Sequence, residues 1–453
     1  MSLTIMDNIL LSSSKTQKLI AKQVLGGFAA IITLGSLILM LPPMTQKGEI
    51  SYIDAVFTAT SAVCVTGLIV QDTPSYFTDL GKSIILILIQ VGGLGIMTVG
   101  SIFTLIIRRR ISIKDKLYLR SSFGTTPYIT AARFFVLIAV TTFAIEFIGF
   151  ILMTLVLYFR YSYPLKSSLT FGLFHSVSAF NNAGFSLYSN SFEGFVSDIP
   201  INLIIMALIV LGGIGYPVIS EIISFRKMKV ISLHSKIVII TTLVLILAGA
   251  ILFFLLELDN PATLKEKDIP TKIIASFFQS VTSRTAGFNT IPIGKLTQAT
   301  LLILIILMFI GASPGGTGGG VKTTTLAVVV AAAIHALRGR SQICLRKRRL
   351  PETIVYRALT LTFVALFFIT FSTIGILILE KCSLSQALFE VVSAFGTVGL
   401  STGITFSLST PSKIILIFCM FVGRVGITTL SVAIAIRTIA DKIVYPEETT
   451  IIG

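Results

Sequence analysis

The segment FHSVSAFNNAGF, from Phe174 to Phe185, decides the fold of this chain because closely related segments occur three more times. Each copy begins like a short amphipathic helix, too short to cross a bilayer, and contains a glycine near its end. The other copies are FTATSAVCVTGL from Phe57 to Leu68, FQSVTSRTAGF from Phe278 to Phe288, and FEVVSAFGTVGL from Phe389 to Leu400. The third copy is one residue shorter when aligned on its start. Such recurrence predicts four structurally similar units.

A second set of glycines follows the first at a nearly constant distance. The glycines near the segment ends are Gly67, Gly184, Gly287 and Gly399, and 24 to 28 residues after each comes another, Gly92, Gly212, Gly311 and Gly423. The first glycines of successive units are 103 to 117 residues apart. We therefore divide the chain into four repeats, residues 1–115, 116–232, 233–350 and 351–453.

The composition places these repeats in a membrane. The chain has 453 residues, of which 54% are hydrophobic and 12% charged, a balance that ordinary soluble domains do not reach. Apolar windows long enough to span a bilayer recur along it. Each repeat then consists of a spanning helix, a short helix entering from outside, an irregular stretch and a second spanning helix. Because each repeat crosses twice, all four share one orientation, unlike the halves of inverted-repeat transporters. The predicted fold is an all-α polytopic membrane protein with four helix–pore-loop–helix repeats around a pseudo-fourfold axis.

The positive charge of the chain is unevenly distributed. The formal net charge is +16, and 23 of the 36 Lys and Arg residues fall in the segments that face inward if the N-terminus is cytoplasmic. This asymmetry follows the positive-inside rule and predicts that both termini are cytoplasmic. The excess charge is thereby explained by a membrane environment, with lipid as the partner and no nucleic acid.

The irregular stretches predict a site for a cation. Non-helical backbone at membrane depth must line a cavity or be buried in protein, since lipid offers no hydrogen bonds. A glycine permits positive φ, which helps successive carbonyl oxygens to point toward a common axis. The stretches contain no carboxylate, which favours a monovalent ion, and the negative ends of the short-helix dipoles would favour it further. The predicted filter residues are Val65, Thr66, Gly67, Asn182, Ala183, Gly184, Thr285, Ala286, Gly287, Thr397, Val398 and Gly399.

The stretch GGTGGGVKTTT, from Gly315 to Thr325, has two interpretations. A phosphate-binding loop needs a glycine directly before its lysine, and Val321 occupies that place before Lys322. A nucleotide-driven pump is therefore only a remote alternative. In the third repeat, the stretch interrupts the second spanning helix and leaves half-helices of about 11 and 14 residues. We predict that it forms a mobile gate in the cavity below the filter, with Lys322 facing the cytoplasmic vestibule. The other three second helices are expected to continue as helix after brief glycine clusters.

A few charged and polar residues lie in apolar surroundings. Arg424 is predicted to lie below the filter, where at about 10 Å and an effective dielectric near 20 it would raise the energy of a passing monovalent cation by about 1.7 kcal/mol. Glu146 is expected to pair with a neighbouring helix or to be neutral, and Arg284 to hydrogen-bond carbonyls beside the third strip. The histidines have no metal-ligand spacing and are expected to be structural. The predicted gate residues are Gly315, Gly316, Thr317, Gly318, Gly319, Gly320, Lys322 and Arg424.

The same segments carry a resemblance to a known family. FHSVSAFNNAGF, TSRTAGFNT and SAFGTVGLSTG, with GASPGGTGGGVKTTT and FVGRVG, closely resemble the Ktr/Trk/HKT superfamily of potassium transporters over nearly the whole chain. Without additional N-terminal helices, the chain looks most like the membrane subunit of a bacterial Ktr-type potassium uptake system. Gly67 matches the potassium-associated pattern of the family, in which serine at this place accompanies sodium transport.

The resemblance implies a function and partners. It implies K⁺ uptake across a bacterial plasma membrane, with K⁺ held by filter carbonyls and the gate loop interacting with Arg424. It also implies a homodimer with two pores and a cytosolic ring of nucleotide-binding regulatory subunits. Two roles for sodium stay open, as an activator or as a coupling ion. The alternative functions are sodium-coupled potassium symport and less selective K⁺/Na⁺ conduction.

Overall fold

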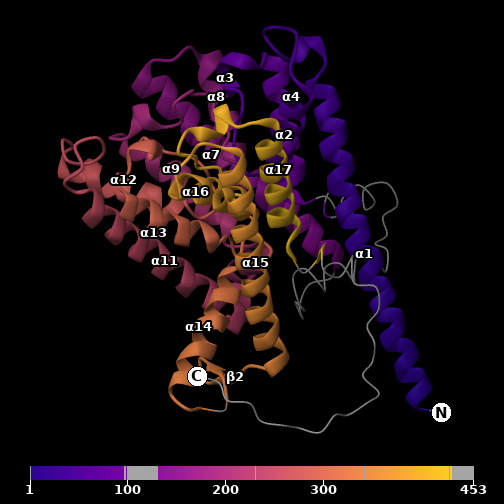
Figure 1. Ribbon diagram of the computed structural model, residues 1–453. Helices are drawn as coiled ribbons and strands as arrows, with labels where there is room; N and C mark the ends of the chain where they lie inside the picture. Colours follow the sequence, from indigo (N-terminus) through magenta and orange to yellow (C-terminus); the bar gives the residue numbers. More distant parts are fainter. Residues whose placement is uncertain are drawn as a thin grey trace.

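The structure, a computed structural model, describes residues 2–95, 98, 131–229, 231–340, 342–427 and 429–430. The described part of the chain is almost entirely helical (Figure 1). The Lys and Arg residues counted above lie in several segments. Two of these segments, residues 108–133 and the C-terminal tail, lie largely outside the described residues.

Four long helices are each followed by a short one. The long helices are α1 (Ser2–Leu39), α7 (Ala131–Tyr161), α11 (Leu233–Glu257) and α15 (Glu352–Leu379). All four contain a segment long and apolar enough to cross a membrane, and within the described residues a bent pair of shorter helices would make a fifth such span. The short helices are α2 (Tyr52–Val63), α8 (Leu165–Phe180), α12 (Ile269–Thr282) and α16 (Leu384–Gly396). Local sequence signals mark where these short helices begin. At α16, for example, Ser383 and Gln386 form a capping box.

A second helix completes each unit: α4 (Asp79–Leu94), α9 (Ile199–Gly213), α13 (Gln298–Phe309) and α17 (Thr410–Val425). In three units the C-terminal end of the long helix is hydrogen-bonded to the N-cap of this second helix. The Glu257 carboxylate accepts from the backbone N–H of Thr297 at 2.9 Å, and the Glu380 carboxylate accepts from that of Ser409 at 2.8 Å. The Tyr161 hydroxyl donates to Asp198 at 2.9 Å. These bonds fix the two helices of a unit against each other.

Every second helix ends at an equivalent place. After α4, α9 and α17 the chain passes through Gly95, Gly215 and Gly426, with φ of 82°, 96° and 87°. Between α9 and α10 (Tyr216–Met228) the direction changes by 100°. These helices were expected to continue as helix after their glycine clusters, and helix does resume after Gly215 as α10. The change of direction was not predicted; it arises because a glycine adopts the left-handed conformation that ends a helix at little cost. In the third unit a longer loop, residues 310–322, separates α13 from α14 (Thr323–Leu337), which have 12 and 15 residues.

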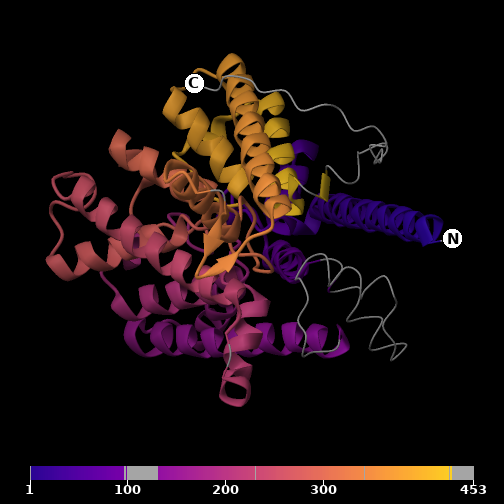
Figure 2. The same cartoon turned by 90° about the horizontal axis from the view of Figure 1, so that it is seen from below.

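Short elements connect these helices. They are α3 (Thr73–Tyr76), η1 (Pro42–Met44), η2 (Glu193–Phe195), η3 (Ile293–Lys295) and η4 (Ile404–Ser407). A hairpin of β1 (Cys344–Leu345) and β2 (Arg348–Arg349) joins α14 to α15 at the far end of the molecule (Figure 1). Seen from below, successive parts of the chain follow one another around the molecule in sequence order (Figure 2). Both α1, at the start of the chain, and α17, in the fourth unit, contact α2, so the arrangement closes into a ring.

Candidate functional site

The four predicted strips follow the C-terminal ends of α2, α8, α12 and α16. In each strip both the first and the third residue have positive φ. The first residues, Val65, Asn182, Thr285 and Thr397, have φ of 51°, 57°, 77° and 51°. The third residues, Gly67, Gly184, Gly287 and Gly399, have φ of 88°, 69°, 84° and 93°. The positive φ expected at the glycines is thus found, and the first residues adopt it although they carry side chains, a conformation uncommon outside glycine.

The four glycines meet in a closed ring. A Cβ atom added to Gly67 would lie 2.6 Å from the carbonyl oxygen of Ala183, and one added to Gly184 would lie 2.7 Å from that of Ala286. A Cβ on Gly287 would collide with the carbonyl oxygen of Val398, and one on Gly399 with that of Thr66. Each strip therefore contacts the next one in chain order, and the fourth contacts the first. The structure brings together all four stretches that the sequence marks as similar.

The amide groups of the strips are bound to their own short helices. The backbone N–H groups of Thr66, Ala183 and Val398 donate to Ser61, Ser178 and Ser393 carbonyls at 2.7 to 2.8 Å. The Ser61 and Ser393 hydroxyls also accept from the N–H groups of the strip glycines, each at 3.1 Å. In the other two units the hydroxyl donates instead, from Ser178 to the Phe185 carbonyl at 2.8 Å and from Thr282 to the Phe288 carbonyl at 2.6 Å.

These hydroxyl residues were missed in the sequence analysis, although a signal for them is present. A serine lies six residues before the strip glycine in three units, as Ser61, Ser178 and Ser393. In the third, shorter copy Thr282 lies five residues before Gly287. Alignment of the four segments on their starts places a hydroxyl residue at the fifth position of every copy.

The strip carbonyls, in contrast, accept no hydrogen bond from the part of the chain that the structure describes. All residues of the four strips are buried except Gly184 and Gly399, which are half-buried. Within the described residues, no group donates a hydrogen bond to a carbonyl oxygen of a strip. Buried carbonyl groups nearly always have a partner. Among the described residues, the strips therefore carry a set of carbonyl oxygens without hydrogen-bond donors where the four glycines meet. Carbonyl oxygens of this kind can coordinate a cation.

The loop of residues 310–322 lies directly against these strips. It is closed at its base by a parallel bridge between Ile310 and Val321. It is then attached to the second unit, where the N–H groups of Ser313 and Thr317 donate to the Gly213 and Gly212 carbonyls at 3.0 and 3.1 Å. It is attached to the fourth unit by a bond of 2.8 Å from the N–H of Gly319 to the hydroxyl of Thr397.

No side chain fits at the point where the loop meets the strips. A Cβ atom on Gly318 would collide with the hydroxyl of Thr285, and one on Gly319 would lie 2.7 Å from the side chain of Thr397. Thr285 and Thr397 are the first residues of the third and fourth strips. The loop therefore covers one end of the ring of strips, and glycine is needed there for space as well as for backbone freedom.

Two cations hold the loop from below. The Arg424 guanidinium, on α17, donates to the carbonyl of Thr317 in the loop and to the carbonyl of Gly92 at the end of α4. It thus links the third unit to the first and the fourth. The Lys322 ammonium donates to the carbonyls of Gly318 and Gly319 at 2.8 and 3.3 Å. The prediction that Lys322 faces a vestibule is corrected: its charge is turned back onto its own loop.

Three glycines of the second set serve close packing. A Cβ on Gly92, Gly212 or Gly423 would collide with the final carbonyls of α2, α8 or α16, those of Val63, Phe180 and Phe395. Close helix packing therefore accounts for glycine at these positions. They hold each short helix against the second helix of its own unit.

The other residues singled out in the sequence have structural contacts. Glu146 accepts hydrogen bonds from the side-chain amides of Gln90 on α4, at 3.2 Å, and of Asn181 at the end of α8, at 2.8 Å, so the expected pairing with neighbouring helices is found. Arg284 donates to the hydroxyl of Thr242 on α11 at 3.4 Å. It therefore points away from the strip, contrary to the prediction. His175 lies between the Phe171 carbonyl and the Ser186 hydroxyl, a structural role.

Comparison with known proteins finds a family and several relatives. A family model described as "TrkH: Cation transport protein" matches residues 10–445. The chain is 38% identical over 421 residues to the Ktr system potassium uptake protein B of Bacillus subtilis, which covers 93% of this chain and 94% of that protein. It is 33% identical over 434 residues to the potassium/sodium uptake protein NtpJ of Enterococcus hirae, covering 94% of this chain and 96% of that protein.

A solved structure has a similar fold. The crystal structure of the potassium transporter TrkH from Vibrio parahaemolyticus matches with a TM-score of 0.66 at 21% identity, covering 91% of this chain and 84% of that one. At this level of identity the likeness concerns the fold alone.

Proposed function

Because this chain belongs to the TrkH family of cation transport proteins, we propose that it takes up K⁺ across the plasma membrane of a bacterium. The observation that carries the proposal is the ring of four strips, whose buried carbonyl oxygens have no protein donor among the described residues. In this proposal the strips are a selectivity filter, and the carbonyls replace the water molecules of a dehydrated K⁺ ion. The names of the relatives, which are potassium uptake proteins, agree with it.

We propose further that the loop of residues 310–322 is the gate. It covers one end of the ring and is attached to other units by a few hydrogen bonds and by Arg424. The loop has Val321 where a phosphate-binding loop needs glycine, and its Lys322 ammonium bonds to carbonyls of the loop itself. This argues against the nucleotide-driven pump, and the family is one of transporters rather than enzymes.

The partners and the role of sodium are also proposals. Two relatives are named as components of a Ktr system, which supports assembly with other subunits. We propose a homodimer bound to a cytosolic ring of nucleotide-binding subunits, with both termini of the membrane chain cytoplasmic. The relative named as a potassium/sodium uptake protein supports sodium as an activator, a coupled ion or a second conducted ion.

Ion flux through the purified chain tests the main proposal. The chain is reconstituted in liposomes, and uptake of ⁸⁶Rb⁺ is measured in competition with K⁺ and Na⁺. We expect uptake that K⁺ suppresses at far lower concentration than Na⁺. Equal suppression by the two ions would favour the less selective alternative, and a fixed dependence of uptake on Na⁺ would favour coupled symport. Uptake no faster than in empty liposomes would contradict the proposal.

A further inference from the structure

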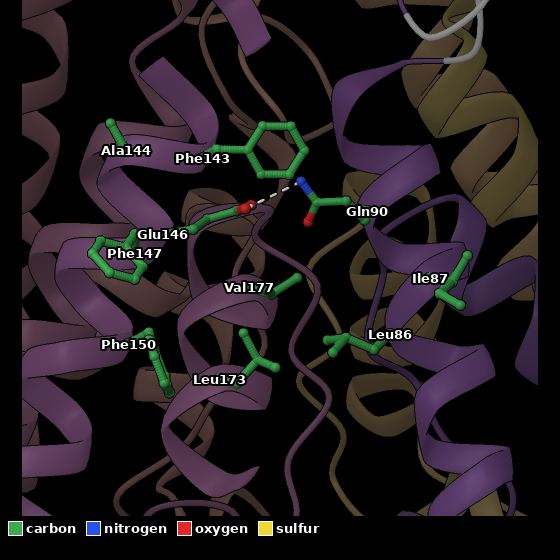
Figure 3. A pocket seen from close by; sticks show the side chains of 10 residues that line it. All are labelled: Leu86, Ile87, Gln90, Phe143, Ala144, Glu146, Phe147, Phe150, Leu173 and Val177. Carbon is green, nitrogen blue, oxygen red and sulfur yellow. Dashed lines mark hydrogen bonds between the residues drawn. The ribbon is translucent and has the colours of Figure 1, made fainter. Parts of the chain in front are cut away.

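A lipid-facing cavity lies beside Glu146, on the outer side of the second strip. It has a volume of about 690 Å³ and lies between α4, α7 and α8 (Figure 3). Its lining is apolar except at one wall, where Gln90 and Glu146 face each other across a hydrogen bond (Figure 3). The apolar lining residues include Ile87, Phe143, Phe147 and Leu173, all of which are exposed. Cavities of this size and character bind small organic molecules.

The polar wall carries an acidic group for which the described residues supply no cation. Both oxygens of the Glu146 carboxyl group accept from amide N–H groups, one from Gln90 and one from Asn181. Glu146 is 5% exposed, and no ion pair found among the described residues includes it. An ionised carboxylate in low-dielectric surroundings gains strongly from a positive partner.

The depth of the carboxylate limits the kind of cation. Glu146 is the middle residue of α7, which runs from Ala131 to Tyr161. At 1.5 Å per residue it lies about 22 Å from either helix end. A phospholipid amine, held at the interface, would have to enter the hydrocarbon region to reach it. A free amine with an apolar body dissolves in the bilayer and has no such restriction.

We propose that this cavity is a binding site for lipophilic organic amines. The apolar body lies against the phenylalanine and leucine side chains, and the ammonium group pairs with the Glu146 carboxylate. The site is connected to the second strip, because the Asn181 amide that holds Glu146 belongs to the residue directly before Asn182. Occupancy is therefore expected to alter flux through the strip, an extension that rests on the proposed function.

Binding can be measured without any flux, because the chain contains no tryptophan. Phe147→Trp places one reporter at the cavity, and Leu155→Trp, at an exposed position of α7 outside the cavity, places a matched reporter in bulk lipid. The quencher is dodecyldimethylamine with bromine on its chain, compared with the corresponding brominated alcohol in zwitterionic liposomes. In the Phe147→Trp variant we expect the amine to quench at roughly tenfold lower mole fraction than the alcohol. In the Leu155→Trp variant the two compounds should quench equally.

Two further changes in the Phe147→Trp chain separate charge from shape. Glu146→Gln removes the charge and is expected to abolish the preference for the amine over the alcohol. Ala144→Phe fills the cavity but keeps the charge, and should weaken quenching by both compounds. The Ala144→Phe variant also provides a test of the cavity if Glu146→Gln impairs folding. Folding of each variant is judged by its size-exclusion elution.

Two outcomes would overturn the proposal. One is equal quenching by amine and alcohol in the Phe147→Trp variant, and the other is a preference for the amine that survives Glu146→Gln. Inhibition of ⁸⁶Rb⁺ uptake by the amine is measured separately, so that failure of the proposed function cannot be mistaken for failure of binding.

Discussion

The strips and the loop beneath them are both glycine-containing, non-helical backbone, but their hydrogen bonds go to different places. The amides of a strip bond to the short helix that precedes it, within seven residues along the chain, as Thr66 and Gly67 do with Ser61. The loop bonds to residues of other units, as Thr317 does with Gly212 and Gly319 does with Thr397. The strips are therefore stabilised locally, whereas the loop depends on contacts between units.

This difference shows how similar residues can serve two purposes. A strip cannot leave its place without unfolding the end of its own helix. The loop can detach by exchanging a few hydrogen bonds, since its base is closed by the Ile310–Val321 bridge. Local bonding suits a rigid filter and bonding between units suits a moving gate, because motion between units breaks only the latter.

The largest effect is expected from Gly67→Ser. A side chain at φ of 88° costs about 1–2 kcal/mol, and its Cβ would displace the Ala183 carbonyl in the adjacent strip. We expect the ratio of K⁺ to Na⁺ permeability to fall by roughly tenfold or more. Gly48→Ser is the matched control, since Gly48 also has positive φ, 76°, but has no atom within 4 Å of an added Cβ. Unchanged reversal potentials in mixed K⁺ and Na⁺ would show that the ring of glycines does not select the ion.

Removal of the Arg424 guanidinium should have the second-largest effect. Arg424→Gln removes the bond to the loop carbonyl of Thr317 and the bond that ties this arginine to α4. It also removes a charge that repels the passing ion, by about 1.7 kcal/mol at roughly 10 Å. We expect ⁸⁶Rb⁺ flux to rise by up to roughly tenfold with selectivity unchanged. Deletion of residues 315–320 should act in the same direction. Arg340→Gln, at an exposed arginine away from the loop, is the control. Unchanged or lower flux in a folded Arg424→Gln protein would contradict the gate.

The hydroxyl residues allow a comparison within the strips. Ser61→Ala leaves the buried N–H of Gly67 without an acceptor, whereas Ser178→Ala leaves the Phe185 carbonyl without this donor. An orphaned buried N–H group costs about 1–3 kcal/mol, and under-bonded carbonyls are more readily tolerated. We expect Ser61→Ala to lower the melting temperature and the ion selectivity more than Ser178→Ala. Ser83→Ala, at an exposed serine of α4, provides the baseline. The reverse order would mean that the hydroxyls do not hold the strips.

The smallest effect is expected at a contact between units that lies outside the gate. The Lys413 ammonium and the Asp54 carboxylate are 2.7 Å apart and join the fourth unit to the first. Burial raises the pKa of Asp54, but hydrogen bonds from Lys413, Gln71 and Ser51 outweigh it and hold the pKa below its ordinary value.

A lowered carboxyl pKa stabilises the folded state above the unfolded-state value of about 4, and this stability is lost as the pH falls further. Asp54→Asn should cost about 1 kcal/mol at neutral pH and less under acidic conditions below that value, with flux and selectivity unchanged. Thermal unfolding as a function of pH measures this. A change in flux would show that contacts between units matter to gating wherever they lie.

The sequence predicted those features that recur. Four short helices, each followed by a strip whose glycine has positive φ, could be found because each copy supports the others, and the broken third helix was evident from its many glycines. The turns at Gly95, Gly215 and Gly426 were not predicted, because glycines in an apolar helix pattern also suit close packing, which is the role that Gly92 and Gly212 have.

Directions of side chains were the least predictable. Val65 and Thr397 adopt positive φ because the surrounding backbone requires it, and no local preference of valine or threonine signals this. Arg284 points toward Thr242, which is distant in sequence. Lys322 points toward carbonyls of its own loop, and their position depends on how that loop folds. Such contacts become visible only when the units are assembled.

The ring of glycines also has a genetic consequence. At Gly67, Gly184, Gly287 and Gly399 the space that a side chain would need is occupied by a backbone carbonyl of the next strip. A clash with a side chain can be relieved by a smaller residue at the neighbouring position, but a carbonyl is the same in every residue type. Second-site suppressors of a substitution at one of these glycines should therefore not arise at the facing strip residue. A screen for revertants should return glycine itself, so that the four positions behave as independent, uncompensable sites even though they touch.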